Sequence, residues 1–585
     1  MIETIQKYKG NLILALIILL GAELRLFHLD YQSLWDDEIA TMIQANPKLD
    51  FSSAWDVYMK YDNMPPLYFL IIRYMMMVFG YKSIVLRAFS AIVGISCIPV
   101  FYALTKKMFD AGVAKWAALF MAINPMLIYY AQEGRPYTLM VLFTLLSFSK
   151  FIDSIDQPGN RNLLLYTLYT TLLIYAHFFG IFILFAQILY FFFRLFSTPV
   201  NRVELLKHFW PVPFLIALLH YPSLPQFLKN SQARESWITL PGLTPFNDTL
   251  HAFLGHAEVP LTMALMLILI YVFQSFNGRL NNTRFHLLLF WLLGFLVIPL
   301  FRTYTTMPMI VHRYLIPVLP VVLMMMSAAI LTISEKITRL LIVGIFTLFS
   351  LGDLIIVTNY YYKITKPDYR GNSELILSLR KMKEPVVAEI GWHYGHFIED
   401  VSYMPLSNYV QTIKHTALPS GFWYSGVREN DLKLNEQDRE FIFQNYYTDF
   451  WKNANQTQAI HFKRLPQQGA FIAPHHLSNA DLSSGMCVVN APATATVSLD
   501  SGNYTLHFTT LSLPEKPIND TNAQALITVN GKIAGTFTSS HLYSGYNDIK
   551  WAMMSGTNTI TIQNTTHGNG KRFLIFKNLV IEKIP

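Results

Sequence analysis

Long apolar stretches separated by short polar segments fill the chain from residue 11 to about residue 358. A helix needs about 20 apolar residues to cross the hydrocarbon core of a bilayer. About eleven stretches approach that length, so the pattern predicts a polytopic α-helical membrane protein with about eleven transmembrane helices. Beyond residue 358 the long stretches end, and the remaining chain has the mixed pattern of a water-soluble protein.

The C-terminal part contains two different patterns. Helical spacing over 373–383 is followed by an apolar run, typical of a buried strand, over 385–390. After residue 485, short alternating runs are separated by turn residues, and Asn530 with Gly531 forms a strong hairpin signal. The expected regions are a membrane domain at 1–358, a mixed α/β region at 359–484, and a carbohydrate-binding-like β-sandwich at 485–585.

The placement of charge supports the membrane interpretation. The net charge is +8, but charged residues make up only 14% of the chain, compared with about 25% in soluble proteins. Lys and Arg lie mainly in the short loops between apolar stretches, which indicates membrane orientation and argues against nucleic-acid binding. Lys7 and Lys9 place the N-terminus in the cytoplasm. With eleven spans, the basic loops lie inside and the C-terminal region lies outside the plasma (inner) membrane.

This topology depends on residues 65–80. The segment begins with two prolines, carries Arg73 in its middle, and is short for a membrane span. We expect it to form an amphipathic helix lying along the outer membrane surface. The alternative is a crossing helix, which would move Lys106 and Lys107 to the outside.

Three consecutive acids, Asp36, Asp37 and Glu38, follow the first predicted span on the outer side. A carboxylate within hydrogen-bond reach of a hydroxyl can act as its general base. Adjacent carboxylates can also hold a divalent cation. The simpler alternative is the first turn of a helix, where acids interact favourably with the helix dipole. The local pattern leaves these alternatives open.

Other polar residues lie at predicted outer ends of spans. Ionisable groups at membrane depth are costly and therefore tend to be functional. Arginine binds phosphate well, although its side chain can also extend to lipid headgroups, and a lone histidine often serves only in packing. The candidates are Glu133, Arg135, Tyr137, His177, Arg313, Tyr314, Lys366 and Arg370.

Six segments in this order resemble motifs of the GT-C superfamily of polyprenyl-phosphate-sugar glycosyltransferases. They are LWDDEIAT at 34–41, PPLYF at 65–69, YYAQEGRPY at 129–137, YAHFFG at 175–180, RYLIPVLP at 313–320 and KPDYRG at 366–371. The most similar branch contains the protein O-mannosyltransferases and the lipid A aminoarabinose transferases. The resemblance covers about residues 10–370 and implies a GT-C transmembrane catalytic domain.

The resemblance also implies a reaction. Relatives transfer a single sugar, with inversion, from a polyprenyl-phosphate carrier to an acceptor hydroxyl on the outer face of the membrane. Asp37 and Glu38 match the family's Asp-Glu pair, whose aspartate acts as base or orients the acceptor, and Glu133 matches a second acidic position. Tyr314, with Arg313 beside it, matches the tyrosine that helps bind the carrier phosphate. The remaining substrate-binding candidates are Asp36, Arg135, Tyr137, His177, Lys366 and Arg370.

Two departures from the family pattern affect these expectations. Met64 precedes the two prolines where many relatives have His or Lys, and Asp36 adds an extra acid beside the expected base. No cofactor is assigned, and metal dependence stays open, with a divalent cation as a candidate that has no assigned ligands. Expected partners are the lipid-linked donor, the bilayer, and a protein, glycolipid or polysaccharide acceptor.

Two other functions remain open at this level. A ligase or polymerase would move a whole oligosaccharide from a polyprenyl-diphosphate carrier. A transporter or lipid-handling protein would place its polar groups near the membrane midplane, often within inverted repeats. Here the ionisable candidates lie near the predicted outer surface, and no internal repeat is visible. The pattern identifies neither the sugar nor the acceptor.

Overall fold

The computed structural model divides into two compact units. It describes residues 2–584 except 61–63, 198–201, 233–237, 239–243, 279–281, 382–383, 390, 428–433, 466–468, 473–476, 480–486, 490–491, 515–522, 540–544 and 566–571. The first unit contains residues 1–31 and 40–363, and the second contains 32–39 and 364–585. The short segment 32–39 therefore packs with the C-terminal chain, although its neighbours in sequence belong to the first unit.

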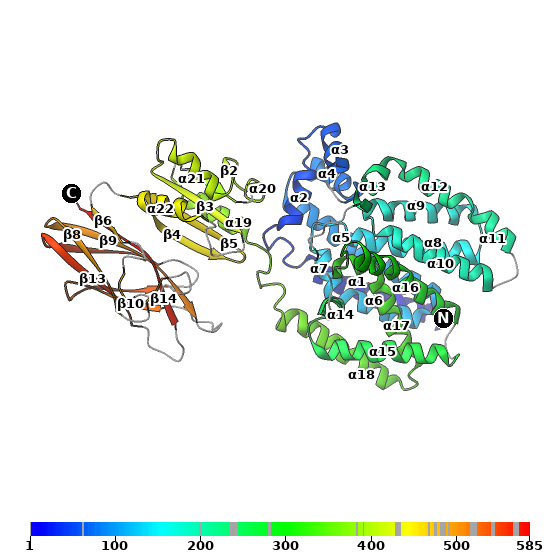
Figure 1. Ribbon diagram of the computed structural model, residues 1–585. Helices are drawn as coiled ribbons and strands as arrows, with labels where there is room; N and C mark the ends of the chain where they lie inside the picture. Colours follow the sequence, from blue (N-terminus) through cyan, green and yellow to red (C-terminus); the bar gives the residue numbers. More distant parts are fainter. Residues whose placement is uncertain are drawn as a thin grey trace. The chain divides into compact units, whose positions relative to one another are not determined.

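Helices make up the described part of the first unit (Figure 1). The longer ones are α1 (Ile2–Leu26), α5 (Ser83–Met108), α6 (Ala111–Ile123), α8 (Tyr137–Asp156), α9 (Asn160–Ala176), α10 (Gly180–Ser197), α15 (Glu258–Phe276), α16 (Asn282–Thr305), α17 (Leu319–Thr332) and α18 (Lys336–Gly352). The shorter ones are α2 (Asp36–Gln44), α3 (Phe51–Lys60), α4 (Leu67–Phe79), α7 (Pro125–Ala131), α11 (Arg202–Phe209), α12 (Pro211–His220), α13 (Leu224–Gln232), α14 (Thr244–Leu254), η1 (Tyr221–Ser223), η2 (His312–Val318) and η3 (Asp353–Val357).

Seven helices in the described part of the chain are long and apolar enough to cross a membrane, and the bent pair α6–α7 would make an eighth. The other predicted spans fall on α1, on α9 and on the short helices α11 to α13. The predicted class, a polytopic helical membrane protein with a C-terminal region of β-sheets, is confirmed. The count of about eleven spans stays a prediction.

A break between α6 and α7 bends the chain by 56°. The Arg25 side chain, only 1% exposed, donates hydrogen bonds to the carbonyls of Met121 and Ala122 at the end of α6. On the other side of the break, the Asn124 side chain accepts a hydrogen bond from the backbone of Leu127 at 3.0 Å. Both helix ends therefore have partners for backbone groups that would otherwise be unpaired. The bend aims α7 toward the segment that carries Glu133.

Helix α4 covers most of the segment expected to lie along the membrane surface. Its 13 residues span about 20 Å, which is short of the roughly 30 Å hydrocarbon core. Arg73 is buried and donates to the backbone carbonyls of Asn46 and Leu49, just after α2. These contacts favour a surface helix that supports the chain following α2, and the orientation itself stays a prediction.

The second unit contains one mixed sheet and two antiparallel sheets (Figure 1). The mixed sheet has the order β2-β1-β3-β5-β4, and the other two have the orders β11-β10-β13-β8 and β12-β9-β14-β6, with β7 paired to β14. The elements of the mixed part are α19 (Tyr369–Leu379), β1 (Val386–Ala388), α20 (Gly391–Tyr394), β2 (Val401–Tyr403), α21 (Leu406–Lys414), β3 (Gly421–Val427), α22 (Glu436–Asn445), β4 (Tyr446–Ala454) and β5 (Thr457–Arg464). The remaining strands are β6 (Gly469–Ile472), β7 (Cys487–Val489), β8 (Ala493–Leu499), β9 (Gly502–Pro514), β10 (Ala523–Val529), β11 (Lys532–Ser539), β12 (Gly545–Met553), β13 (Gly556–Asn564) and β14 (Arg572–Lys583).

Local patterns in this unit correspond to these elements. The expected helix over 373–383 falls on α19, and the expected strand over 385–390 contains β1. Asn530 and Gly531 both have positive φ, of 51° and 76°, in the turn between β10 and β11. A two-residue turn with this geometry matches the twist of a hairpin. The expected domain boundaries at residues 358 and 484 stay predictions.

The topology can be tested with single cysteines in a background that carries Cys97→Ala and Cys487→Ser. Lys106 is exposed, so a cysteine there should react with an impermeant maleimide only after the cells are permeabilised. Lys48, also exposed and located after α2, provides the control and should react in intact cells. Labelling of Lys106→Cys from outside intact cells would contradict the flat orientation of α4.

Candidate active site

The acidic triplet forms the first turn of α2. The backbone N–H of Glu38 and that of Ile39 both donate to the carbonyl of Trp35 at 2.9 Å, which begins the helix. Negative charge is favourable at this end because the helix dipole is positive there. Successive residues of a helix point about 100° apart, so the three carboxylates leave the turn in three different directions.

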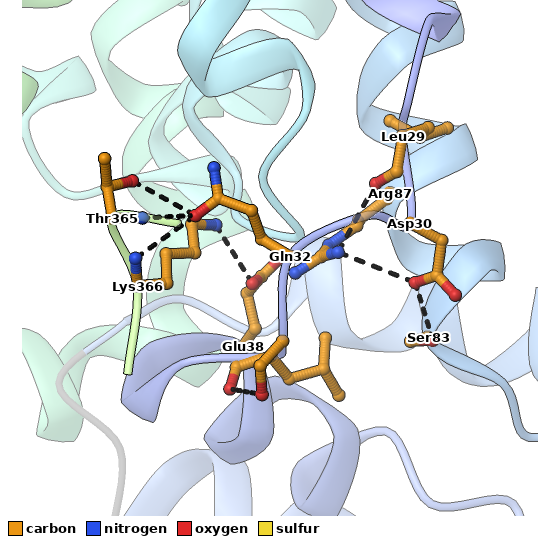
Figure 2. A network of polar contacts seen from close by, with 10 residues as sticks. Leu29, Asp30, Gln32, Glu38, Ser83, Arg87, Thr365 and Lys366 are labelled. Carbon is orange, nitrogen blue, oxygen red and sulfur yellow. Dashed lines mark hydrogen bonds and ion pairs between the residues drawn. The ribbon is translucent and has the colours of Figure 1, made fainter. Parts of the chain in front are cut away.

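Glu38 is fully buried and forms an ion pair with Lys366 (Figure 2). The distance from Lys366 Nζ to Glu38 Oε2 is 3.1 Å, and Lys366 is also buried. The Lys366 ammonium lies 5.9 Å from the centre of the Trp35 ring. A buried charge is tolerated when it is paired. The charge of Lys366, expected to face a phosphate, is thus engaged with Glu38.

Backbone contacts fix the same segment against residues 365–370. The Gln32 side-chain oxygen accepts hydrogen bonds from the backbone and hydroxyl of Thr365 and from the backbone of Lys366, each at 3.1 Å (Figure 2). The Ser33 hydroxyl accepts one from the backbone of Arg370 at 3.0 Å. The motif at 366–371 therefore positions the acids through its backbone as well as through Lys366.

Asp36 is held by two aromatic residues that the sequence analysis did not single out. The Tyr369 hydroxyl donates to Asp36 Oδ1 at 2.7 Å, and His393 Nε2 lies 3.5 Å from the same oxygen. The Tyr369 and His393 rings stack at 4.8 Å. The neighbouring Tyr394 stays protonated, because burial raises its pKa to about 12. Tyr369 lies within the KPDYRG motif and could have been proposed, whereas His393 has no motif around it that points to this role.

Asp37 lies between these two engaged acids in the sequence. It is half-buried, and the helix turns its side chain away from the directions of both Asp36 and Glu38. Tyr369 binds Asp36, and Lys366 neutralises Glu38. The three acids of this turn therefore have different surroundings.

The segment immediately before residue 32 is anchored within the first unit. Arg87 is 1% exposed, and its guanidinium lies 3.5 Å from Asp30 and donates to the backbone carbonyl of Leu29 at 3.3 Å (Figure 2). The Ser83 hydroxyl donates to the same Asp30 carboxylate at 3.0 Å. The chain leading to the acidic segment therefore has a fixed starting point.

A second group of predicted residues comes together within the first unit. The His177 ring lies 5.4 Å from the Tyr314 ring and 6.0 Å from the Tyr137 ring. The Arg313 guanidinium lies 5.5 Å from the centre of the Tyr314 ring. The charges of Arg135 and Arg313 are close enough to Tyr137 and His177 to act on both electrostatically. We refer to these five residues as the aromatic–arginine cluster.

Glu133 and Arg135 lie next to this cluster. Both side chains are buried, and the backbone N–H of Arg135 donates to the carbonyl of Glu133 at 2.8 Å. Arg135 Nη1 donates to the hydroxyl of Thr41 at 3.2 Å. Thr41 is in the part of α2 that belongs to the first unit. The negative charge of Glu133 acts on Tyr137 as well.

The described residues contain no group of three or more His, Cys, Asp or Glu side chains arranged to hold a metal ion. Within these residues no set of ligands is assigned to a divalent cation, which stays a candidate from the sequence alone.

Comparison with known proteins adds independent information. The family model for dolichyl-phosphate-mannose-protein mannosyltransferases matches residues 63–225. No curated protein matches the chain significantly. The apo structure of ArnT from Cupriavidus metallidurans matches with a TM-score of 0.51 at 11% identity, covering 78% of this chain and 98% of ArnT. ArnT bound to undecaprenyl phosphate matches with the same score at 10% identity, covering 77% of this chain and 97% of ArnT.

Residues 63–225 are thus similar to a mannosyltransferase family, and the chain shares its fold with ArnT. The predicted resemblance is confirmed to that extent. The archaeal oligosaccharyltransferase AglB from Archaeoglobus fulgidus, in complex with an inhibitory peptide and a dolichol-phosphate, covers 99% of this chain and 97% of its own. Its TM-score is 0.49 at 12% identity.

The buried ion pair predicts a specific stability pattern. Lys366→Met leaves the Glu38 carboxylate buried without its cation and should destabilise the protein by about 3–5 kcal/mol. Adding Glu38→Gln to this variant removes the stranded charge and should restore much of the loss. Thermal unfolding of the detergent-solubilised protein measures both effects. Equal melting temperatures for the wild type and Lys366→Met would show that the pair is not buried in solution.

Proposed function

We propose that this GT-C protein is an inverting glycosyltransferase that moves a single sugar from a polyprenyl-phosphate carrier to an acceptor hydroxyl at the outer face of the plasma membrane. The observation that carries the proposal is the placement of two consecutive residues. His177 lies in the aromatic–arginine cluster, and Phe178 lines a large apolar groove. A lipid-linked phosphate needs a positively charged site for its phosphate and an apolar groove for its hydrocarbon chain, and the cluster and the groove offer these two features.

The groove has the size and lining of a lipid-binding site. Its volume is about 880 Å³, and its lining residues come from the helices α8 to α13 and η1 of the first unit and from the connections between them. Apolar side chains dominate its wall, including Ile181, Leu184, Phe209, Val212, Ile216 and Phe227. Burial of each methylene-sized group contributes about 0.8 kcal/mol, so a long isoprenoid chain would be held firmly there.

The cluster suits a phosphate with one negative charge. Arg135 and Arg313 supply two positive charges, and the neighbouring Glu133 removes one. A sugar linked through one phosphate is an anionic phosphodiester, and two arginines suit an anionic ligand of this kind. ArnT, which shares the fold, has been crystallised with undecaprenyl phosphate, and this supports the same class of carrier here.

The reaction needs a base and a stabilised leaving group. Asp37 accepts the proton of the acceptor hydroxyl, whose oxygen attacks the anomeric carbon opposite the carrier. The bond between that carbon and the phosphate oxygen breaks, and its electron pair leaves with the polyprenyl phosphate. Arg313 and Tyr314 stabilise the charge that develops on the phosphate. Arg370 remains a weaker candidate for the same role, and the protein, glycolipid or polysaccharide acceptor is to be identified by experiment.

The base can be tested in cells that lack this protein. Complementation with the wild type should add one sugar mass to an envelope component, measured by mass spectrometry, whereas Asp37→Asn should reduce that transfer by about 10²–10⁴-fold. Asp36→Asn is the matched control, because Tyr369 holds Asp36, and should cost less.

Two results would contradict this proposal. Transfer by Asp37→Asn at the wild-type rate would exclude Asp37 as the base. An added mass of several sugars would identify an oligosaccharide ligase instead.

The groove makes a separate prediction about chain length. Ala217 lines the groove, so Ala217→Trp fills part of it and should weaken binding of undecaprenyl phosphate about tenfold, which corresponds to 1.4 kcal/mol. Binding of a short-chain analogue, farnesyl phosphate, should change less. Leu218→Trp alters the adjacent residue, which is 70% exposed and does not line the groove. Equal weakening by both variants would argue against the groove as the lipid site.

A further inference from the structure

His177 has a fixed arrangement of its ring proton. It lies between α9 and α10 and is 2% exposed. The backbone N–H of Phe179 lies 3.2 Å from His177 Nδ1. A backbone N–H can only donate, so Nδ1 must be the accepting, unprotonated nitrogen. The ring is therefore neutral with its hydrogen on Nε2, and Nε2 is a hydrogen-bond donor.

This donor has no hydrogen-bond partner among the residues that the structure describes. The same holds, within those residues, for the hydroxyl of Tyr137, which is fully buried. Buried polar groups in folded proteins nearly always have a partner, and each exception needs an explanation. Other buried side chains also have such atoms, but these two donors lie on rings 6.0 Å apart and near Arg135 and Arg313, which points to a shared ligand.

The local structure holds the His177 ring in place before any ligand arrives. The Phe179 ring packs edge-on against His177 at 5.4 Å and also lies 4.9 Å from Tyr314. A Cβ at Gly180 would lie 2.8 Å from the Leu173 side chain and 3.0 Å from the backbone of Ile174, so only glycine fits this turn. A donor positioned in this way does not have to reorganise when charge develops.

We propose that His177 Nε2–H and the Tyr137 hydroxyl together donate hydrogen bonds to the phosphate of the lipid carrier. The inference rests on the function proposed above and adds two neutral donors to Arg135 and Arg313. The nearby positive charges favour an anionic oxygen over a sugar hydroxyl as the acceptor. His177 directly precedes the groove residue Phe178 in the chain, and this supports a carrier whose hydrocarbon chain and phosphate are bound by adjoining parts of the first unit.

Two substitutions of His177 separate its two nitrogens. Glutamine places an amide N–H close to the position of Nε2 and keeps the donor. Asparagine reaches only the position of Nδ1, so it can accept from Phe179 but loses the donor. We expect His177→Gln to bind undecaprenyl phosphate within about threefold of the wild type. His177→Asn should bind about 10- to 100-fold more weakly, as expected for loss of a hydrogen bond to a charged group.

The measurement is calorimetric titration of the full chain in detergent. Undecaprenol, which lacks the phosphate, is the matched ligand, and its affinity should be the same for all variants. Tyr137→Phe should also weaken binding of undecaprenyl phosphate and leave that of undecaprenol unchanged. Inorganic phosphate at millimolar concentration distinguishes the source of the anion: weak competition indicates a lipid-linked phosphate, whereas tight competition indicates a site for free phosphate and overturns the assignment to the carrier.

The binding measurements can contradict the proposed role of His177 and Tyr137 in two ways. Wild-type affinity in both His177→Asn and Tyr137→Phe overturns it while leaving the proposed function intact. Equal losses in His177→Gln and His177→Asn, or a parallel loss of undecaprenol binding, would show that the ring only supports packing. A wild-type protein that binds undecaprenol as tightly as undecaprenyl phosphate would contradict the proposed function itself.

Discussion

The ion pair between Glu38 and Lys366 is the interaction on which the acidic segment depends. Neither group could be buried alone, because the attraction of the partner must offset the cost of removing each charge from water. The two residues are far apart in sequence but lie 3.1 Å apart, so the chain after the last membrane helix determines where α2 begins. Gln32, Ser33 and Asp36 also form hydrogen bonds with residues 365–370, so these contacts join the same two segments of the chain.

The same constraint explains why the three acids differ. Glu38 is neutralised by a cation, Asp36 accepts a hydrogen bond from Tyr369, and Asp37 is half-buried and points elsewhere. Identical chemistry in consecutive residues thus leads to different roles because a helix separates their directions by about 100°. Two of the acids fix the turn, and the third has the direction that the proposed reaction requires of its base.

Much of this organisation could be predicted from the sequence, for physical reasons. Apolar length and loop charge indicate a polytopic membrane protein, because the bilayer imposes both requirements. The grouping of Tyr137, His177 and Tyr314 follows from their shared position at helix ends. His393 could not be predicted, because its contact with Asp36 depends on the tertiary fold and leaves no periodic pattern. The break at α6 is also invisible locally, since its stabilising residue, Arg25, belongs to another helix.

Several buried arginines of the first unit have backbone or carboxylate partners. Arg25 and Arg73 each bind two backbone carbonyls of other segments, and Arg87 is paired with Asp30. In an apolar interior such compensation is required, because an unpaired polar group there costs free energy. The Tyr137 hydroxyl and His177 Nε2 have no such partner within the described residues, although they adjoin two arginines. Other buried side chains, such as Tyr271, also have an atom without a partner within the described residues. The two donors on Tyr137 and His177 differ because they lie together beside two arginines, and the phosphate of a lipid is a ligand that would accept from both.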